Sequence, residues 1–325
     1  MSDFQILFRR TGGPEVLERE KVTLRKPGPG EVVVRQHAVG VNFIDTYHRT
    51  GLYPLDLPSG LGGEAAGEVE QVGEGVTEVR PGDRVAYSGG PLGAYATARI
   101  FPSDLLLKLP DSVDDRTAAA VLLKGLTVDM LVGACAKVER GQTVLVHAAG
   151  GGVGSLLVQW LRDIGATVIA HAGTPEKSGL AKSLGATHAL SCPMGELPNT
   201  VRSLTDDRGV DVVMDGVGKA SWDASLDALA KRGLLVSYGN ASGAVPPVAP
   251  LALTKAGSVF LTRPTLYDYL DSRAAREAAA ARLFTKLADG VLKVEIGRIF
   301  PLAEAAEAHR ALEARETTGS TILLT

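Results

Sequence analysis

The chain has 325 residues, of which 45% are hydrophobic, and a formal net charge of −3 at pH 7. A chain of this length can bury a large core, and about two domains are expected. Because no bulk basic charge is present, we expect neither a nucleic-acid partner nor a membrane partner. The amino terminus has no long apolar segment behind a basic start, and the most apolar stretch, 118–136, is interrupted by Lys124 and Asp129. We therefore expect a cytoplasmic protein.

The periodicity of the apolar residues changes along the chain. Up to about residue 110, short Val- and Ile-rich segments alternate with Gly and Pro turns such as "KPGPGE", which predicts a β-rich, barrel-like domain. From about 125 to 264, five or six short strands alternate with helices, and we expect helices at 154–165, 175–184 and 219–231. This alternation predicts an α/β fold with a doubly wound parallel sheet of the Rossmann kind. After it come an Ala-rich helix within 272–290, a strand, a helix near 303–315 and the strand "STILLT", which do not continue the parallel pattern.

A glycine-rich loop, "HAAGGGVG", joins the first strand of the α/β segment to an apolar helix. Ala148, Gly151 and Gly154 fall at the three small positions of the dinucleotide-binding fingerprint, with Ala in place of the first Gly. Small residues let backbone N–H groups approach a pyrophosphate at the positive end of a helix that starts near Val153. We expect Gly151, Gly152, Val153 and Gly154 to bind a dinucleotide; the alternative is a turn that needs glycine for packing alone.

The end of the second strand, "HAGTPEK", bears on which dinucleotide binds. An NAD site usually has a carboxylate there for the ribose 2′-hydroxyl, and this chain has none. Gly173 leaves space, Thr174 can cap a helix that begins at Pro175, and Lys177 lies in the first turn, where a cation is unfavourable unless it meets an anion. A 2′-phosphate would be that anion, so we expect NADPH; the alternative is a solvated surface lysine.

Several segments together resemble one family over the whole chain: "GQTVLVHAAGGGVGSLLVQWLR", "VGVNFIDTYHRTGLYP", "LPSGLGGEAAGEVEQVGEGV", "GDRVAY" and "LLKGLTV". They resemble the zinc-free quinone oxidoreductases, the zeta-crystallin-like group of the medium-chain dehydrogenase/reductase superfamily. The resemblance implies a GroES-like β-barrel catalytic domain over 1–125, a Rossmann NADPH-binding domain over 126–265, and a return to the catalytic domain over 266–325. It also implies a homodimer that pairs the edge strand "SVFLTRP" across a two-fold axis.

The chain departs from the zinc-bearing relatives of this superfamily at their metal ligands. Where those carry two cysteines and a histidine, this chain has Asn42, Gly63 before Glu64, and an apolar residue near Leu123. Without thiolate or imidazole there, no tetrahedral zinc site can be built, and the six histidines show no ligand spacing. We therefore expect no metal. Quinones fit this chemistry because they accept hydride without a Lewis acid, and electron-poor enones meet the same condition.

The site residues are implied by position in the resembling enzymes. Asn42, Tyr47 and Tyr53 are the candidate catalytic residues, and the first two also face the cofactor. The further residues implied at the cofactor are Lys124, Thr127, Cys192, Tyr238, Gly239, Asn240, Arg263 and Arg315. Many relatives have tyrosine or histidine in place of Cys192. The alternatives are that Tyr47 only packs with Phe43 on one helical face and that the two arginines are surface charges. Both cysteines, Cys135 and Cys192, are expected to be buried thiols.

The expected function is NADPH-dependent reduction of a small-molecule quinone, with hydride transfer that needs no metal ion. Two alternatives stay open. One is an enone or enoyl thioester reductase of the same superfamily. The other is a nucleotide-binding protein that binds RNA or serves as a structural crystallin.

Overall fold

The computed structural model describes residues 2–325, which form two compact units. The first unit contains the chain up to Gly125, then Ser272–Asp289 and Val294–Thr325. The second unit contains Leu126–Asp271 and Gly290–Lys293. Both ends of the chain therefore belong to the first unit, and the second unit is inserted between them.

The second unit is built on six parallel strands in the order β11-β10-β9-β12-β13-β14. Their bounds are β9 Thr143–Val146, β10 Thr167–His171, β11 His188–Leu190, β12 Val210–Asp215, β13 Leu229–Ser237 and β14 Phe260–Thr262. Counted along the chain from β9, the spatial order is 3-2-1-4-5-6, which is that of the Rossmann fold. The α/β prediction is confirmed, and the order changes direction between β9 and β12, where such folds bind ligands.

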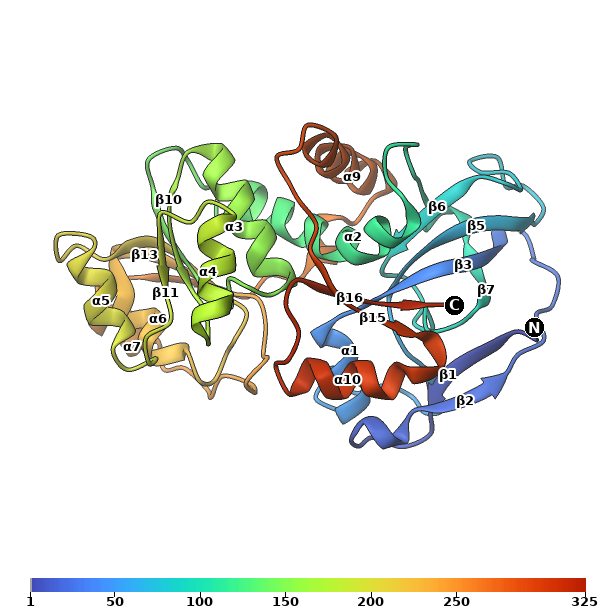
Figure 1. Cartoon of the computed structure of the whole chain (residues 1–325), viewed down its shortest axis with the longest axis horizontal. Helices are drawn as coiled ribbons and strands as arrows, with labels where there is room; N and C mark the ends of the chain where they lie inside the picture. Colours follow the sequence, from blue (N-terminus) through green and yellow to red (C-terminus); the bar gives the residue numbers. More distant parts are fainter. Residues whose placement is uncertain (1) are drawn as a thin grey trace. The chain divides into compact units, whose positions relative to one another are not determined.

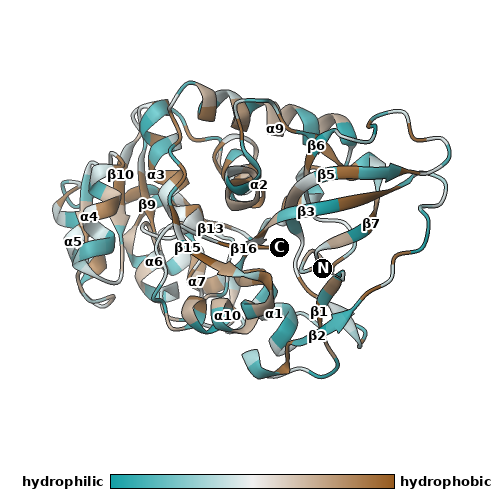
Figure 2. Cartoon of the chain, turned by 45° about the vertical axis from the view of Figure 1, so that its right-hand side comes forward, coloured by the Kyte–Doolittle hydropathy of each residue, from teal (hydrophilic) through white to brown (hydrophobic). Residues whose placement is uncertain are grey.

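Helices join successive strands of this sheet, one further helix follows β14, and the apolar strands lie between these helices (Figures 1 and 2). Their bounds are α3 Gly152–Ile164, α4 Pro175–Ser183, α5 Leu197–Ser203, α6 Trp222–Ala228, α7 Pro250–Lys255 and α8 Leu266–Tyr269. The helix α3 begins two residues before the expected position, and α4 ends within a residue of its prediction. The sequence did not predict α5, whose Leu197 and Val201 are fully buried against the sheet.

The prediction of a helix over 219–231 is wrong at both ends. The helix α6 stops at Ala228, and β13 begins with the next residue, Leu229. Leu229 is buried and pairs with Val210 at the start of β12. Burial in the sheet therefore overrides the helical propensity of the segment around Lys231.

Close packing of α3 on β9 requires a glycine at position 154. A Cβ at Gly154 would overlap the carbonyl oxygen of Ala148 and would lie 2.7 Å from the Cα of Ala149. Both obstacles are backbone atoms, so no side-chain rotation can relieve them. Gly154 thus lets the first turn of α3 approach the end of β9, as the third glycine of a dinucleotide fingerprint does.

The first unit is mainly antiparallel β-structure and contains two sheets. A three-stranded sheet has the order β2-β1-β4, from β1 Phe4–Phe8, β2 Glu18–Lys21 and β4 Ser59–Gly60. The larger sheet has the order β15-β16-β3-β5-β6-β8, with β7 paired to β3. Its strands are β3 Glu31–Val41, β5 Glu64–Val72, β6 Arg84–Ser88, β7 Ala98–Pro102, β8 Leu107–Lys108, β15 Ile296–Pro301 and β16 Ser320–Leu324. The chain's last strand, β16, is antiparallel to β3, which joins the two ends of the chain (Figure 1).

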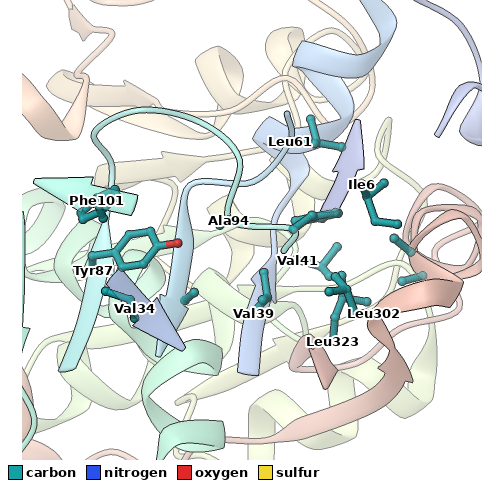
Figure 3. Close-up of a cluster of buried hydrophobic side chains, with 14 of the residues drawn as sticks. Ile6, Val34, Val39, Val41, Leu61, Tyr87, Ala94, Phe101, Leu302 and Leu323 are labelled. Carbon is teal, nitrogen blue, oxygen red and sulfur yellow. The ribbon is translucent and has the colours of Figure 1, made fainter. Parts of the chain in front are cut away.

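One apolar core joins the early strands to the carboxyl-terminal segments of this unit. Figure 3 shows Val34, Val39 and Val41 of β3 in the same cluster as Leu302 and Leu323. All five are almost completely buried. Helices α1 Phe43–Thr50, α2 Asp115–Asp129, α9 Arg273–Ala288 and α10 Ala305–Glu313 complete the unit, although α2 runs past its boundary at Gly125.

The helical segment Asp115–Cys135 is long and apolar enough to cross a membrane by length and composition. It comprises α2 and the π-helical stretch Met130–Cys135. Its most apolar window is 72% buried inside the protein, as in the core helix of a globular domain. Burial against protein therefore accounts for its apolar character.

Two helical glycines give a matched test of the packing at α3. We expect Gly154→Ala to destabilise the protein by about 1–3 kcal/mol, because the added methyl group overlaps backbone. Gly179→Ala in α4 is the control, since a Cβ there meets no atom within 4 Å. It should stabilise the protein by up to about 1 kcal/mol through helix propensity. Urea unfolding of both variants measures the difference, and equal effects would contradict the packing argument.

Candidate functional site

The glycine-rich loop makes a tight turn between β9 and α3. Ala148 adopts a left-handed conformation with φ 51°, which explains why this position favours glycine. The N–H of Gly151 donates to the carbonyl oxygen of Ala148 at 2.9 Å, and Gly151 is the N-cap residue of α3. The first N–H groups of α3 thus begin directly after the turn, at the carboxyl end of β9. This geometry fits the pyrophosphate of a dinucleotide.

The first turn of α4 packs against the same loop. Thr174 caps α4 as predicted, since its hydroxyl accepts from the N–H of Lys177 at 3.3 Å. A Cβ on Gly150 would lie 2.8 Å from the Cβ of Lys177. Lys177 therefore lies next to the glycine-rich loop, and its side chain is half-buried. Gly173 is exposed, with no atom within 4 Å of where its Cβ would be.

Arg263 fixes the loop that follows β13. Its Nη1 donates to the carbonyl oxygens of Ser237 at 3.0 Å and of Gly239 at 2.9 Å. The side-chain oxygen of Asn240 accepts from its Nη2 at 3.1 Å. The ring of Tyr238 lies over Gly216, where a Cβ would come within 2.8 Å of it. The structure thus brings four predicted cofactor residues, Tyr238, Gly239, Asn240 and Arg263, together at the carboxyl end of β13.

A buried network around Asp215 supports the ends of the central strands. The Asp215 carboxylate accepts from the N–H groups of Val217 and Gly218 and from the hydroxyls of Ser221 and Ser225. Ser225 Oγ also lies 3.0 Å from Nε2 of His147, the residue that precedes the left-handed Ala148. Burial lowers the pKa of His147 to about 4, so this imidazole is neutral near pH 7. Sequence analysis did not single out this network.

In the first unit, several predicted residues converge on the fully buried carboxylate of Glu64. Its Oε2 accepts from Nδ2 of Asn42 at 2.8 Å, and its Oε1 accepts from the N–H of Leu123 at 2.6 Å. The ammonium group of Lys124 lies 3.6 Å from Oε2. Residues from the start of α1, from α2 and from β5 are therefore held around one negative charge.

A second buried carboxyl group, Asp45, lies one helical turn from Asn42. Asp45 Oδ2 accepts from the N–H of Asn42 at 2.9 Å, as part of a capping box that starts α1. It also accepts from the hydroxyl of Tyr95 at 3.0 Å, which in turn lies 3.0 Å from Nε2 of His309. Burial raises the pKa of Asp45 to about 7, and burial lowers the pKa of His309 to about 3. Only Asn42 in this group was predicted; a capping box over 42–45 was a signal that could have indicated Asp45.

The other predicted residues lie in separate places. Tyr47, on α1, packs its ring edge-on against Tyr53 with centroids 5.3 Å apart, and the expected contact with Phe43 is also present at 6.5 Å. Thr127 belongs to the second unit, whereas Arg315 is an exposed residue of the first. Cys192 offers its carbonyl oxygen, which lies 3.0 Å from Nε2 of His171. Both cysteines are free thiols and only partly buried, so the expectation of two buried thiols is wrong.

No group of three His, Cys, Asp or Glu side chains suited to a metal ion occurs within residues 2–325. At Gly63, a Cβ would lie 3.9 Å from Cδ2 of Leu92 and 4.0 Å from the backbone N of Gly89, which is ordinary van der Waals contact. The donors actually gathered here are an amide, a backbone N–H and an ammonium group. An amide N–H, a backbone N–H and a protonated ammonium group offer no lone pair to a metal, so the groups around Glu64 do not suit a metal cation.

Comparison with known proteins agrees with this geometry. Residues 28–111 match the family model of the alcohol dehydrogenase GroES-like domain, and residues 152–283 match that of zinc-binding dehydrogenase. A quinone oxidoreductase of Pseudomonas aeruginosa is 49% identical over 321 residues, covering 98% of this chain and 99% of that protein. A 2-haloacrylate reductase of a Burkholderia species is 42% identical, covering 98% of both chains. The crystal structure of Escherichia coli quinone oxidoreductase complexed with NADPH superposes with a TM-score of 0.97 at 42% identity, covering 99% of this chain and all of that one.

The fold and the dinucleotide loop thus define an oxidoreductase of the medium-chain dehydrogenase/reductase superfamily. Within that superfamily, the chain belongs to the quinone oxidoreductase family. The resemblance seen in the sequence is confirmed.

The raised pKa of Asp45 predicts a pH-dependent contribution to stability. The folded state holds a proton on Asp45 between about pH 4 and pH 7 that the unfolded chain releases, so this contribution is full below about pH 4 and is lost as the pH rises through 7. Asp45→Asn should therefore cost about 2 kcal/mol more stability at pH 5 than at pH 8. Urea unfolding at both pH values measures this. The exposed Asp104→Asn is the control, and a pH-independent cost at Asp45 would contradict the assignment.

Proposed function

We propose that this chain reduces quinones by hydride transfer from NADPH, without a metal ion. The observation that carries the proposal is the set of groups on Glu64. The positions of the missing zinc ligands are Asn42, Gly63 and Leu123, and the carboxylate beside them is already bonded by Asn42 and by the N–H of Leu123. A substrate at such a site must accept hydride without a Lewis acid, and a quinone does so because it is strongly electron-poor.

The cofactor is NADPH, and the second unit fits it. The N–H groups at the start of α3 suit the pyrophosphate, and Lys177 beside the loop suits the 2′-phosphate. The relatives support this cofactor, since the E. coli enzyme was crystallised with NADPH. When bound, NADPH supplies two electrons and one proton as hydride.

The residues of the first unit orient the acceptor. Glu64 fixes the amide of Asn42, so its Oδ1 is aimed in one direction and can orient the nicotinamide carboxamide. Tyr47 and Tyr53 form a rigid aromatic pair that suits the flat face of a quinone. On this proposal, the first unit is the catalytic domain and the second unit is the NADPH-binding domain, in a cytoplasmic enzyme.

A second candidate substrate class is the electron-poor enones, including enoyl thioesters. The relative named 2-haloacrylate reductase favours it, because that name denotes reduction of a carbon–carbon double bond next to a carboxylate. The two classes differ in the product anion, which is a phenolate for quinones and an enolate for enones.

A substrate panel tests the proposal. Enzyme dialysed against a strong chelator should oxidise NADPH with phenanthrenequinone and other quinones at least tenfold faster, in kcat/KM, than with a 2-alkenal, a 2-haloacrylate or an enoyl thioester. The undialysed enzyme is the control and should have the same activity. Faster reduction of enones than of quinones would show that electron-poor enones are the substrates. Loss of activity on dialysis that only added zinc restores would contradict the metal-free mechanism.

Cofactor choice gives a separate prediction. A lysine–phosphate contact screened by solvent contributes about 1–2 kcal/mol, so Lys177→Ala should raise the KM for NADPH about tenfold while leaving kcat and the KM for NADH nearly unchanged. Gly173→Asp should weaken NADPH further, because the open space there lets a carboxylate face the 2′-phosphate. Steady-state kinetics with both cofactors measures this. If Lys177→Ala weakens the binding of NADPH and NADH equally, Lys177 does not contact the 2′-phosphate.

We also propose a homodimer through β14. This strand is at the edge of the second unit's sheet, and its Phe260 and Leu261 are 58% and 37% exposed. An apolar edge strand with unpaired N–H groups is a liability unless a second copy covers it. Sedimentation should give twice the chain mass of 33.9 kDa, and Phe260→Lys should shift the protein toward monomer. The exposed Leu251→Lys on α7 is the control, and a wild-type monomer at micromolar concentration would contradict the proposal.

A further inference from the structure

The Lys124 ammonium group is buried without a hydrogen-bond partner. Its side chain is 7% exposed, and Nζ has no partner within hydrogen-bonding distance. The nearest carboxylate oxygen, Oε2 of Glu64, is 3.6 Å away, which is an ion pair but too long for a hydrogen bond. An ammonium group has three N–H donors, and burying them unsatisfied is costly. A ligand oxygen at this place would satisfy them.

Glu64 cannot move to meet Lys124. Its Oε1 is held by the N–H of Leu123 and its Oε2 by Asn42. The carboxylate also lies directly against Gly40, where a Cβ would overlap Oε2. The carboxylate therefore balances the charge of Lys124 from a fixed position and leaves its donors for another acceptor.

The other carboxyl group near Lys124 and Glu64 is Asp45, whose raised pKa of about 7 leaves it largely neutral below that pH. Lys124 is thus the group there that can stabilise a developing negative charge on a substrate oxygen.

We propose that Lys124 Nζ donates a hydrogen bond to a quinone carbonyl oxygen and protonates that oxygen after hydride transfer. This inference rests on the proposed function and adds the proton donor that the reaction needs. Hydride transfer leaves the hydroquinone monoanion, in which one oxygen is a phenolate. The N–H bond of Lys124 then breaks as the O–H bond of the hydroquinone forms, and water returns a proton to the neutral amine. The sum is quinone, NADPH and one proton giving hydroquinone and NADP⁺.

Proton transfer between these groups needs little driving force. Alkylammonium ions and phenols are acids of similar strength in water, so neither direction of transfer is steeply uphill. A positioned general acid contributes about 10²- to 10⁴-fold to a rate. Because water can partly replace it here, we expect a loss near the lower end of that range.

The kinetic test compares Lys124→Met with the surface control Lys108→Met, since Lys108 pairs with Asp83 and is half-exposed. Lys124→Met should lower kcat about a hundredfold. The loss should grow with the basicity of the hydroquinone anion across a series of substituted quinones. The affinity for NADPH, measured by its fluorescence, should change less than twofold. Because Lys124→Met leaves Glu64 without its cation, the double variant Lys124→Met/Glu64→Gln removes both charges and should show the same kinetic loss.

A binding experiment tests the contact between Lys124 and the substrate oxygen without turnover. 4-Nitrophenol resembles the hydroquinone anion, and its ionised form is yellow. Bound to wild-type enzyme saturated with NADP⁺, its pKa should fall by about one unit or more, whereas the double variant should leave it at the value in water. The lowered value would show that an ammonium group meets the phenolate oxygen.

Each outcome separates the inference from the function on which it rests. Unchanged kcat in both Lys124 variants, or a nitrophenol pKa that is the same in wild type and double variant, overturns the inference. A tenfold loss of NADPH affinity overturns it as well, because Lys124 would then be a cofactor residue. If the wild-type enzyme does not reduce quinones, the proposed function itself is rejected. If the wild type and the Lys124 variants reduce quinones equally well, only the inference about Lys124 is rejected.

Discussion

The buried carboxylate of Glu64 is the interaction on which the first unit's site depends. It joins β5, the start of α1 and the middle of α2 through hydrogen bonds of 2.8 and 2.6 Å and an ion pair of 3.6 Å. Burying a charged pair gains little stability over apolar packing, but removing one partner is costly because the other charge stays buried. Such an arrangement indicates a functional constraint at this position. Because the Glu64 carboxylate is fixed, the ammonium group of Lys124 can stay buried while its N–H donors remain available to another acceptor.

The second unit places its charges differently. The N–H groups at the start of α3 and the first turn of α4, with Lys177, lie at the glycine-rich loop, and the buried Asp215 network holds the end of β12. The pKa of His147 is lowered by burial, so this network adds no positive charge under the loop. On the proposed function, the positive field that the dinucleotide meets comes from the start of α3 and from Lys177. On the same proposal, cofactor binding and substrate polarisation depend on separate sets of residues, which single substitutions can distinguish.

Local patterns account for what the sequence predicted well. Strands, turns and helices alternate at short spacing from β9 to α4. The start of α4 is marked by Thr174 and Pro175, which lie next to each other in the sequence. The prediction of a helix over 219–231 was wrong and α5 was missed because burial against the sheet decides both segments, and local propensity does not contain that information. In the first unit, Asn42 came from a resemblance, and Glu64 lies 22 residues from Asn42 and 59 from Leu123. The pair of Tyr95 and His309 spans 214 residues, so only the folded structure brings these groups together.

A crystal structure of the enzyme with NADP⁺ and a non-reducible quinone analogue would test the central claim most directly, which is that an ammonium group held by Glu64 meets the substrate oxygen. The account predicts Lys124 Nζ within about 2.7–3.2 Å of a quinone oxygen, with Glu64 still bonded to Asn42 and Leu123. A quinone bound with both oxygens away from Lys124, and Nζ still facing Glu64 alone, would contradict it.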